Sequence, residues 1–191
     1  MITFTAGSTQ TINGTLTLDG ASGQLLTINS SSVGTPATIA FSTSSTFSGD
    51  HVSVQDSTLT DLDLGDGLAL PLNPANSTNV SGNTGWFGIT VTGTLYSDDG
   101  TTPITTADQT VAVSINGAAA GNTDVTDGSG VFQLLIDGSF TSGDVLTVYL
   151  DDETAKAVAV VTIAGNSAVT TDLYQNYLIV EDEDASEITN A

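Results

Sequence analysis

Three carboxylates and two glycines occur together in residues 61–67, where Asp61, Asp63 and Asp66 stand at alternate or nearly alternate positions. Carboxylate oxygens are ligands that Ca²⁺ prefers, and glycine permits the sharp turn that a binding loop needs. The spacing is not that of a complete EF-hand loop, because no Glu follows at its twelfth position. The same alternation also fits a strand with these aspartates outward and the intervening leucines inward. The sequence therefore leaves open a calcium site or a solvated acidic face.

No other group of residues supplies the parts of a catalytic site. His51 is the only histidine and the chain has no cysteine, so these residue types cannot complete a zinc site. The 22 acidic residues form many carboxylate pairs of the kind that glycosidases use, but they gather in turns and in the C-terminal tail. Aromatic residues, in which carbohydrate clefts are rich, are only 6% of the chain. We therefore expect that the protein is not an enzyme.

The charge of the chain excludes several classes of partner. Lys156 is the only basic residue apart from His51, and the formal net charge is -21. Neutralising a phosphate backbone or an anionic lipid surface requires several clustered cations, so we expect no binding to nucleic acid or to anionic lipid. The longest apolar-rich run, residues 155–164, carries Lys156 and is far shorter than the roughly 20 residues that span a bilayer. We therefore expect no membrane insertion.

The beginning of the sequence lacks the features of a secretion signal. Met1 is followed neither by basic residues nor by a long apolar core. If the protein is exported, we expect this chain to be a mature piece or an excised part of a longer protein.

The first half of the chain has the pattern of many short strands. Apolar residues alternate with polar residues, and pairs of them recur every thirteen residues. These pairs are Leu26 with Ile28, Ile39 with Phe41, and Val52 with Val54. Short strands at nearly constant spacing predict stacked rungs in which each rung pairs with the next, and an antiparallel sandwich is the alternative. We expect residues 1–87 to form a stacked-strand, β-helix-like module.

The end of this module is marked by a change in composition and in the alternation of apolar and polar residues. Residues 71–85 lack alternation and are rich in turn-forming residues, and Trp86 follows directly. A single Trp at such a position is expected to be a buried apolar plug near the junction. A sugar-stacking surface is the alternative.

The second half has the pattern of a β-sandwich. Val111, Val113 and Ile115 alternate with polar or small residues, and Asn116-Gly117 then forms a hairpin dipeptide. Further alternating runs follow, with turns every 8–15 residues. This spacing predicts an immunoglobulin-like sandwich over residues 88–165, without the Cys and Trp signature of antibody domains.

Four stretches of the second half resemble a bacterial immunoglobulin-like repeat: VTGTLYSDDG (91–100), VAVSINGAAA (111–120), TDGSGVF (126–132) and GDVLTVYLD (143–151). DLYQNYLIV (172–180) resembles the segment that follows the sandwich in such proteins, and the first half resembles the β-helical rungs that precede it. The resemblance implies a repeated scaffold of large secreted or surface proteins, such as adhesins, surface layers and extracellular fibres. It implies no active site.

Residues 166–191 are expected to form a linking strand and an acidic tail. A strand that follows a complete sandwich needs a partner, either in the same sandwich or in a neighbouring copy through strand addition. Ile2 and Phe4 mark an equally plain strand at the other end, and pairing between unlike ends is head-to-tail and open-ended. The residues expected to take part in assembly are Ile2, Phe4, Leu173, Tyr174, Tyr177, Leu178, Ile179 and Val180.

The sequence thus predicts an all-β structural subunit of an extracellular bacterial fibre or surface layer. Its partners would be copies of itself in a head-to-tail homopolymer. The alternatives are a non-polymerising adhesin or spacer module of a larger surface protein, with a surface glycan or protein as ligand, and a carbohydrate-binding accessory domain. Ca²⁺ at Asp61, Asp63 and Asp66 is the one cofactor that the residues suggest.

Overall fold

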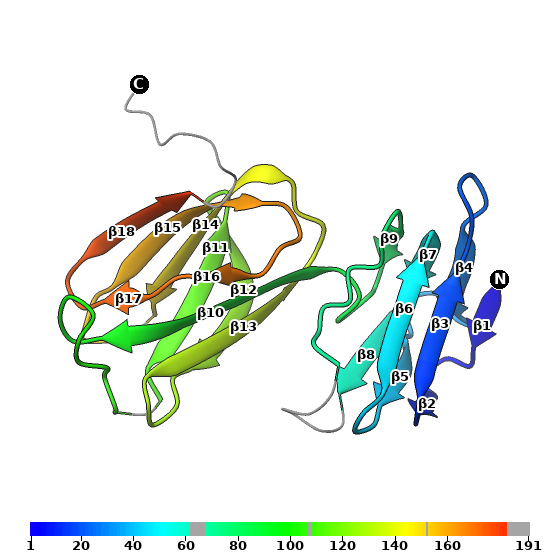
Figure 1. The fold of residues 1–191 in the computed structure, drawn as a ribbon, viewed down its shortest axis with the longest axis horizontal. Coiled ribbons are helices and arrows are strands. Elements are labelled where there is room, and N and C mark those ends of the chain that lie inside the picture. The colour runs from blue at the N-terminus through cyan, green and yellow to red at the C-terminus, as the bar shows by residue number, and fades with distance from the viewer. Residues whose placement is uncertain (62–67, 107, 152, 183–191) are drawn as a thin grey trace. The chain divides into compact units, whose positions relative to one another are not determined.

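All regular elements in the described part of the chain are β-strands. The structure is a computed structural model that describes residues 1–61, 68–106, 108–151 and 153–182. Within these residues it has strands β1 to β18 and no helix (Figure 1). The all-β class predicted by the alternation of apolar and polar residues is therefore confirmed.

The strands belong to two units. The first unit contains Met1–Gly88 and Asp137–Ser139. The second contains Ile89–Ile136 and the described residues from Phe140 onward. Each unit has its own sheets and its own apolar core, so each is described separately below.

The first unit consists of parallel strands in three sheets. The chain passes from the first sheet to the second and the third, and then returns to the first, so it coils. The first sheet contains β1 (Ile2–Phe4), β4 (Leu26–Ser30), β7 (Val52–Gln55) and β9 (Thr78–Ser81); the second contains β2 (Thr9–Ile12), β5 (Ala37–Phe41) and β8 (Ser57–Asp61); the third contains β3 (Thr15–Asp19) and β6 (Thr46–Asp50).

The apolar pairs that recur every thirteen residues lie in two different sheets. Leu26 on β4 pairs with Val52 on β7, which is two such steps further along the chain. Ile39, one step along, lies on β5 and pairs with Leu59 on β8. The expectation that each thirteen-residue step pairs with the next is therefore wrong, because one coil of the chain contains two of these steps.

The interior of the first unit is filled by the alternating apolar residues. Ile28, Phe41 and Val54 are fully buried, and Trp86 is also fully buried in this core. The rings of Trp86 and Phe47 meet edge to face, with centroids 5.9 Å apart and an interplanar angle of 83°. Trp86 is thus placed as the plug interpretation requires, and its indole offers no exposed face on which a sugar could stack.

Two sharp corners of the coil use single polar residues. His51 separates β6 from β7, and Asp56 separates β7 from β8, with φ values of 52° and 50°. His and Asp are among the non-glycine residues that most often adopt this left-handed conformation. Nδ1 of His51 lies 2.9 Å from Oδ1 of Asp50. A hydrogen bond from Asn76 and then the bond to His51 lower the pKa of Asp50.

The second unit consists of two sheets. The larger has the strand order β12-β11-β14-β15-β18, and the smaller has the order β13-β10-β16, with β17 also paired to β10. The bounds are β10 (Gly88–Tyr96), β11 (Thr110–Ile115), β12 (Ala118–Val125), β13 (Val131–Asp137), β14 (Ser142–Leu150), β15 (Val158–Ala164), β16 (Val169–Thr170), β17 (Leu173–Tyr174) and β18 (Leu178–Asp182).

Alternate residues of both sheets form the core of the second unit. Leu134, Val148 and Val161 are among its buried members, and each lies in a run where every second side chain is buried. This is the burial pattern of a sheet with one covered face.

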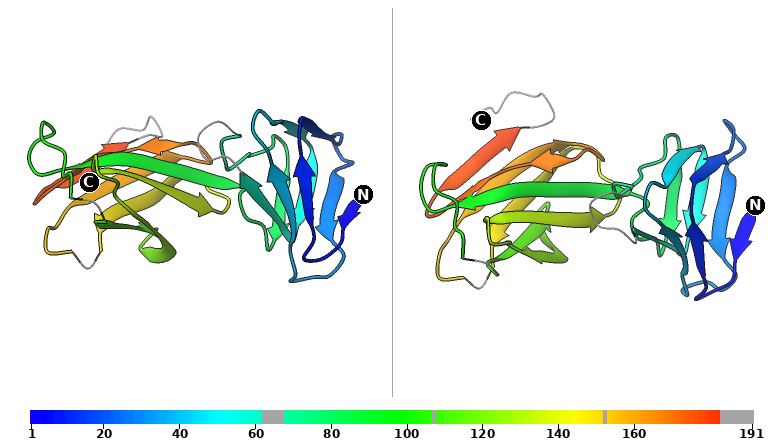
Figure 2. Two further views of the ribbon diagram at one scale, coloured as in Figure 1. Left: turned by 90° about the horizontal axis from the view of Figure 1, so that it is seen from below. Right: turned by 60° about the horizontal axis from the view of Figure 1, so that its bottom comes forward.

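The segment expected to be a linking strand is an integral part of the second unit. β16 and β17 pair in parallel with β10, and β18 pairs in parallel with β15. Of the two alternatives that the sequence left open, this chain has pairing within its own unit. The views in Figure 2 show β18 running beside β15 as the outermost strand of the large sheet.

The packing of successive coils predicts the effect of a methyl group at Gly20, between β3 and β4. A β-carbon there would overlap the carbonyl oxygen of His51 and lie 2.7 Å from the amide nitrogen of Leu26. We expect Gly20→Ala to lower the free energy of unfolding by about 1–3 kcal/mol. At Gly14 a β-carbon would meet nothing within 4 Å, so Gly14→Ala should change the free energy of unfolding by less than about 0.5 kcal/mol. Urea unfolding measures both, and equal stabilities would contradict this coil packing.

A similar close approach in the second unit occurs where β10 meets the C-terminal strands. A β-carbon at Gly93 would overlap the carbonyl oxygen of Thr171 and lie 2.6 Å from Cζ of Phe132. We expect Gly93→Ala to destabilise the protein by about 1–3 kcal/mol, because backbone must move to admit the methyl group. Gly128→Ala, where the added carbon meets nothing within 4 Å, is the matched control. If the two variants have the same melting temperature, the parallel pairing of β16 and β17 with β10 is wrong.

Candidate assembly surface

β18 is the outermost strand of the large sheet among the described residues, so one row of its backbone groups faces away from β15. Its register places Leu178 beside Val158 and Val180 beside Val160, and the amide of Val158 donates to the carbonyl of Tyr177 at 3.3 Å. In a parallel ladder alternate residues direct their N–H and C=O groups to the same neighbour. Residues 177, 179 and 181 therefore face β15, and Leu178, Val180 and Asp182 face away from it.

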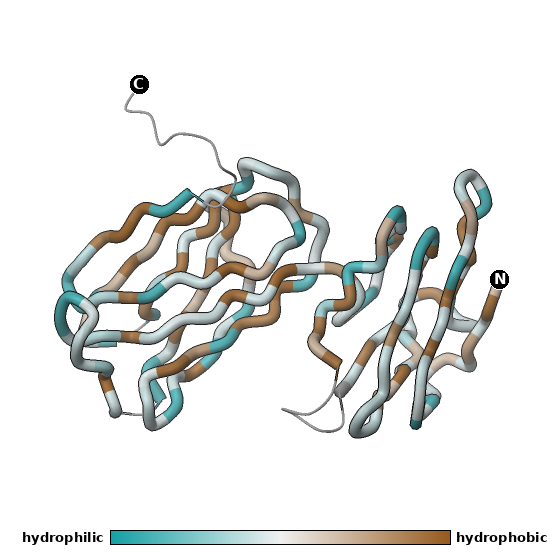
Figure 3. The backbone as a smooth tube through the Cα atoms, viewed as in Figure 1, coloured by the Kyte–Doolittle hydropathy of each residue, from teal (hydrophilic) through white to brown (hydrophobic). Residues whose placement is uncertain are grey.

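The side chains of β18 follow the same alternation. Ile179 is half-buried and packs against the core, whereas Leu178 is 63% exposed and Val180 is 52% exposed. Tyr177, just before the strand, is 55% exposed. The hydropathy colouring in Figure 3 shows this apolar run giving way to a hydrophilic end. Exposed large apolar residues are ordinary when scattered, but here two lie on an edge strand and a third lies just before it.

The exposed residues of β18 continue an apolar row across the outer face of the large sheet. Tyr149 on β14 pairs with Val158 on β15, and Val158 pairs with Leu178 on β18. Such directly opposed side chains are in contact distance and stabilise a sheet as cross-strand pairs. The row therefore extends the apolar surface from the edge into the face of the sheet.

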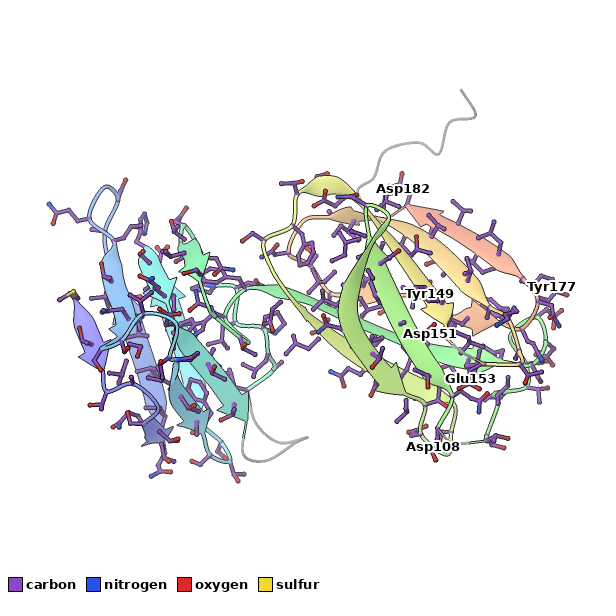
Figure 4. All side chains as sticks on the ribbon, turned by 180° about the vertical axis from the view of Figure 1, so that it is seen from behind. Asp108, Tyr149, Asp151, Glu153, Tyr177 and Asp182 are labelled. Carbon is purple, nitrogen blue, oxygen red and sulfur yellow. The ribbon has the colours of Figure 1, made fainter. Side chains whose placement is uncertain are left out.

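A shallow groove of about 480 Å³ lies along this row. Tyr149, Val158, Tyr177 and Leu178 supply apolar walls, and Lys156 and Asn176 supply polar groups. Figure 4 labels Tyr149 and Tyr177, and it shows Tyr177 and Asp182 at opposite ends of β18. The groove is open to solvent, and its walls are mainly apolar with few polar groups. We call it the Lys156 groove.

The turn between β17 and β18 positions the polar part of the groove. Asn176 adopts a left-handed conformation with φ 67°, and its amide donates to the carbonyl of Lys156 at 2.6 Å. Lys156 is exposed, and its ammonium donates to the carbonyl oxygen of Glu153 at 2.7 Å. The carboxylate of Glu153 instead accepts from the amide of Thr110 at 2.9 Å. In the described residues, therefore, the only lysine is held beside the groove by a carbonyl and not by an ion pair with Glu153.

The residues expected to take part in assembly lie in four different environments. Tyr177, Leu178, Ile179 and Val180 come together at the edge of the large sheet. Leu173 is fully buried in the core of the second unit.

Tyr174 and the two N-terminal residues also lie away from that edge. Tyr174 stacks on Tyr96, with centroids 5.5 Å apart, and burial followed by the charge of Asp172 raises its pKa. Ile2 and Phe4 are half-buried in the first unit, where they pack against its core. The side chains of Ile2, Phe4, Leu173 and Tyr174 are thus engaged in the chain's own packing.

Sequence reasoning did not assign Tyr149, Lys156, Val158 and Asn176 to the same site. One signal was present, because residues 158 and 160 differ in phase from residues 161 and 163, and the strand is therefore apolar on both faces. The side chains of Val158 and Val160 on the outer face are only partly buried, so this face of β15 carries apolar surface outside the core.

The structure describes little of the three candidate calcium ligands. Asp63 and Asp66 lie outside the described residues, and Asp61 is the last residue of β8, without a described side chain. In the described ranges, no group of three or more His, Cys, Asp or Glu residues could hold a metal ion.

The carboxylate of Asp98 accepts hydrogen bonds from residues of its own turn. Its Oδ1 accepts from the amides of Gly100, Thr101 and Thr102 at 3.2, 3.0 and 3.0 Å, and its Oδ2 accepts from Oγ1 of Thr101 at 2.9 Å. The hydrogen bonds from Thr102, and then those from Thr101, hold the pKa of Asp98 well below its usual range. This carboxylate therefore orders its own turn.

Across the part of the chain that the structure describes, no helix has the length and apolar character needed to cross a membrane. Comparisons with models of protein families, with curated proteins and with solved structures find no match to the chain.

The Asp98 turn predicts a pH-dependent loss of stability. The folded-state pKa is lowered, so the carboxylate contributes stability above its unfolded pKa of about 3.9, and this contribution decreases as pH falls through the folded pKa. We expect Asp98→Asn to lower the melting temperature at pH 7 and to differ progressively less from the unmodified protein below about pH 4. Asp99→Asn makes the same charge change next to it and is the control. A constant difference from pH 7 to pH 2 would contradict this role.

Proposed function

We propose that this protein is a structural subunit of an extracellular fibre or surface layer, whose copies join by pairing open strand edges. The observation that carries the proposal is the outer edge of β18, where Leu178 and Val180 direct backbone groups away from β15 and expose apolar side chains. Unpaired edges of this kind add strands from other chains unless charge or a covering element prevents it.

The architecture supports a scaffold role. We propose that the coiled parallel strands form a β-helix-like module and that the two sheets of the second unit form an immunoglobulin-like sandwich. Modules of these kinds resemble parts of large bacterial surface proteins, which is the basis for an extracellular location. Fold alone does not define function, so the assignment depends on the edge of β18.

The net charge supports an assembly that is soluble and dependent on ionic strength. Copies with a formal charge of -21 repel one another over about 8–10 Å at physiological salt. Short-range strand pairing therefore has to overcome this repulsion, and screening ions or divalent cations should promote it. The same charge would keep finished fibres apart.

Head-to-tail pairing, with β1 of one copy on β18 of the next, is the form of assembly that the sequence predicts. It would give a polar fibre, because unlike ends meet at every contact. A spacer or adhesin module that does not polymerise is the main competing function. A carbohydrate-binding domain has less support, because Trp86 is buried.

Electron microscopy and light scattering of the purified protein test this proposal at low and physiological salt, each with calcium and with chelator. We expect filaments or sheets that increase with salt. Their loss in chelator would add a structural role for Ca²⁺. Dispersed particles in all conditions would favour the spacer module and contradict self-assembly.

A substitution at the edge tests whether β18 makes the contact. Deleting residues 172–191 would remove the buried Leu173 and so damage the fold. Val180→Pro is sharper, because it removes an N–H that faces away from β15, and proline is tolerated at such edge positions. We expect a folded monomer, by circular dichroism and urea unfolding, that forms no polymer. Unchanged polymers of this variant would show that another surface joins the copies.

A further inference from the structure

We infer that Asn13 is a site of spontaneous deamidation, at which the side-chain amide becomes a carboxylate, and that the fold protects Asn116 from the same reaction. Both asparagines lie in the tripeptide Ile-Asn-Gly, at residues 12–14 and 115–117. The two sites therefore have the same local chemistry and differ in their surroundings. The inference concerns the covalent chemistry of single residues and does not depend on the proposed function.

The reaction needs only the asparagine, the amide of the next residue and water. The backbone nitrogen of the next residue loses its proton and attacks Cγ of the asparagine, which closes a succinimide ring and releases the side-chain nitrogen as ammonia. Water then opens the ring at either carbonyl. One opening gives aspartate, and the other gives isoaspartate, in which the main chain runs through Cγ. A glycine in the next position favours ring closure, because it has no β-carbon to shield the attacking nitrogen.

Asn13 has the freedom that this attack requires. Asn13 and Gly14 alone connect β2 to β3, and both residues are exposed. Within the part of the chain that the structure describes, no hydrogen bond holds the side chain of Asn13 or the amide of Gly14. A β-carbon at Gly14 would meet nothing within 4 Å, so the turn has room for the rotation that brings Cγ to the attacking nitrogen.

Asn116, in contrast, is held away from the amide of Gly117. Its Nδ2 donates to Oδ1 of Asp144 at 2.9 Å, and its Oδ1 accepts from the amide of Val145 at 2.9 Å. The backbone amide of Asn116 also donates to the carbonyl of Val145 at 2.8 Å. Both ends of the side-chain amide are thus fixed to β14, and these bonds must break before Cγ can turn toward Gly117. The fold therefore distinguishes two identical tripeptides.

Deamidation of Asn13 adds a charge where the chain has none. Residues 1–18 contain no acidic side chain, and all 22 acidic residues of the protein follow them. The reaction therefore places a first carboxylate on the first coil of the first unit.

Isoaspartate also lengthens a connection whose two ends are fixed to the next coil. The carbonyl of Ile12 accepts from the amide of Ser42 at 3.0 Å, and the carbonyl of Gly14 accepts from the amide of Thr46 at 3.1 Å. The additional main-chain carbon has to be accommodated between these two bonds. We therefore expect the isoaspartate form to unfold at a lower urea concentration than the unmodified protein.

Peptide mass spectrometry of the protein incubated at mildly alkaline pH tests the inference. Chymotrypsin cuts after aromatic residues and leucine, so Asn13 is recovered in residues 5–16 and Asn116 in residues 97–132. In the folded protein we expect Asn13 to deamidate about tenfold faster than Asn116, because the hydrogen bonds of the Asn116 side chain oppose the attack. In a denaturing concentration of urea the two sites should react at similar rates. Equal rates in the folded protein would overturn the inference.

Variants at each site separate the chemistry from a change in fold. Gly14→Ala is expected to leave the stability unchanged, but its methyl group shields the attacking nitrogen, so deamidation of Asn13 should slow severalfold. Asp144→Ala removes the acceptor of Asn116 and should speed deamidation of Asn116 severalfold. Asp144→Asn retains an acceptor oxygen and should have a smaller effect. Circular dichroism confirms that each variant folds. A rate at Asn116 that does not respond to Asp144→Ala would contradict protection by this contact.

Aged samples test the effect on the first coil. Asn13→Asp adds the carboxylate without the additional carbon, and Asn13→Gln blocks the reaction. We expect aged protein to unfold at a lower urea concentration than either fresh protein or Asn13→Asp, in proportion to the isoaspartate found in fragment spectra. Aged Asn13→Gln should unfold as it does when fresh. An intact Asn13 after long incubation would overturn the inference, and isoaspartate without loss of stability would overturn its effect on the coil. Neither result bears on filament formation.

Discussion

The parallel ladder between β15 and β18 is the interaction on which the properties of the candidate assembly surface depend. Its register determines that Ile179 points to the core and that Leu178 and Val180 point outward. A shift of one residue would exchange the two sets, burying Leu178 and exposing Ile179. The same register determines which backbone groups face outward. Burial of one side chain in the core thus specifies both the chemistry and the backbone orientation of the outer edge of β18.

A second constraint is the scarcity of cations. The chain satisfies many carboxylates with its own backbone amides. Asp127 accepts from Ser129 at 2.7 Å and from Val131 at 3.0 Å, and Asp172 accepts from Thr94 at 2.8 Å. These bonds stabilise turns and strand crossings that a protein with more basic residues would support with Lys or Arg. Acidic residues are therefore structural in this chain as well as solubilising.

The strands and their inward residues could be predicted from the sequence, because a period of two reports which face of a strand is covered. Val113 and Ile39 belong to such alternating runs in the sequence, and both are buried. The neighbours of each strand could not be predicted, since alternation carries no information about pairing partners. This is why the thirteen-residue recurrence gave the wrong neighbour for Leu26, and why the destination of the C-terminal strand stayed open. The Lys156 groove was missed for the same reason, because its residues become neighbours only through the β14-β15-β18 order.

The coiling of the first unit has a consequence for how such a chain changes length. Each coil is a stretch of sequence that returns the chain to the same sheet, as Leu26 on β4 and Val52 on β7 illustrate. Duplicating or deleting one such stretch would add or remove a layer while leaving the first and last layers as they are. Gene-level growth by whole layers would therefore lengthen a scaffold without redesigning its ends, and the second unit would keep its exposed edge whatever the number of layers before it.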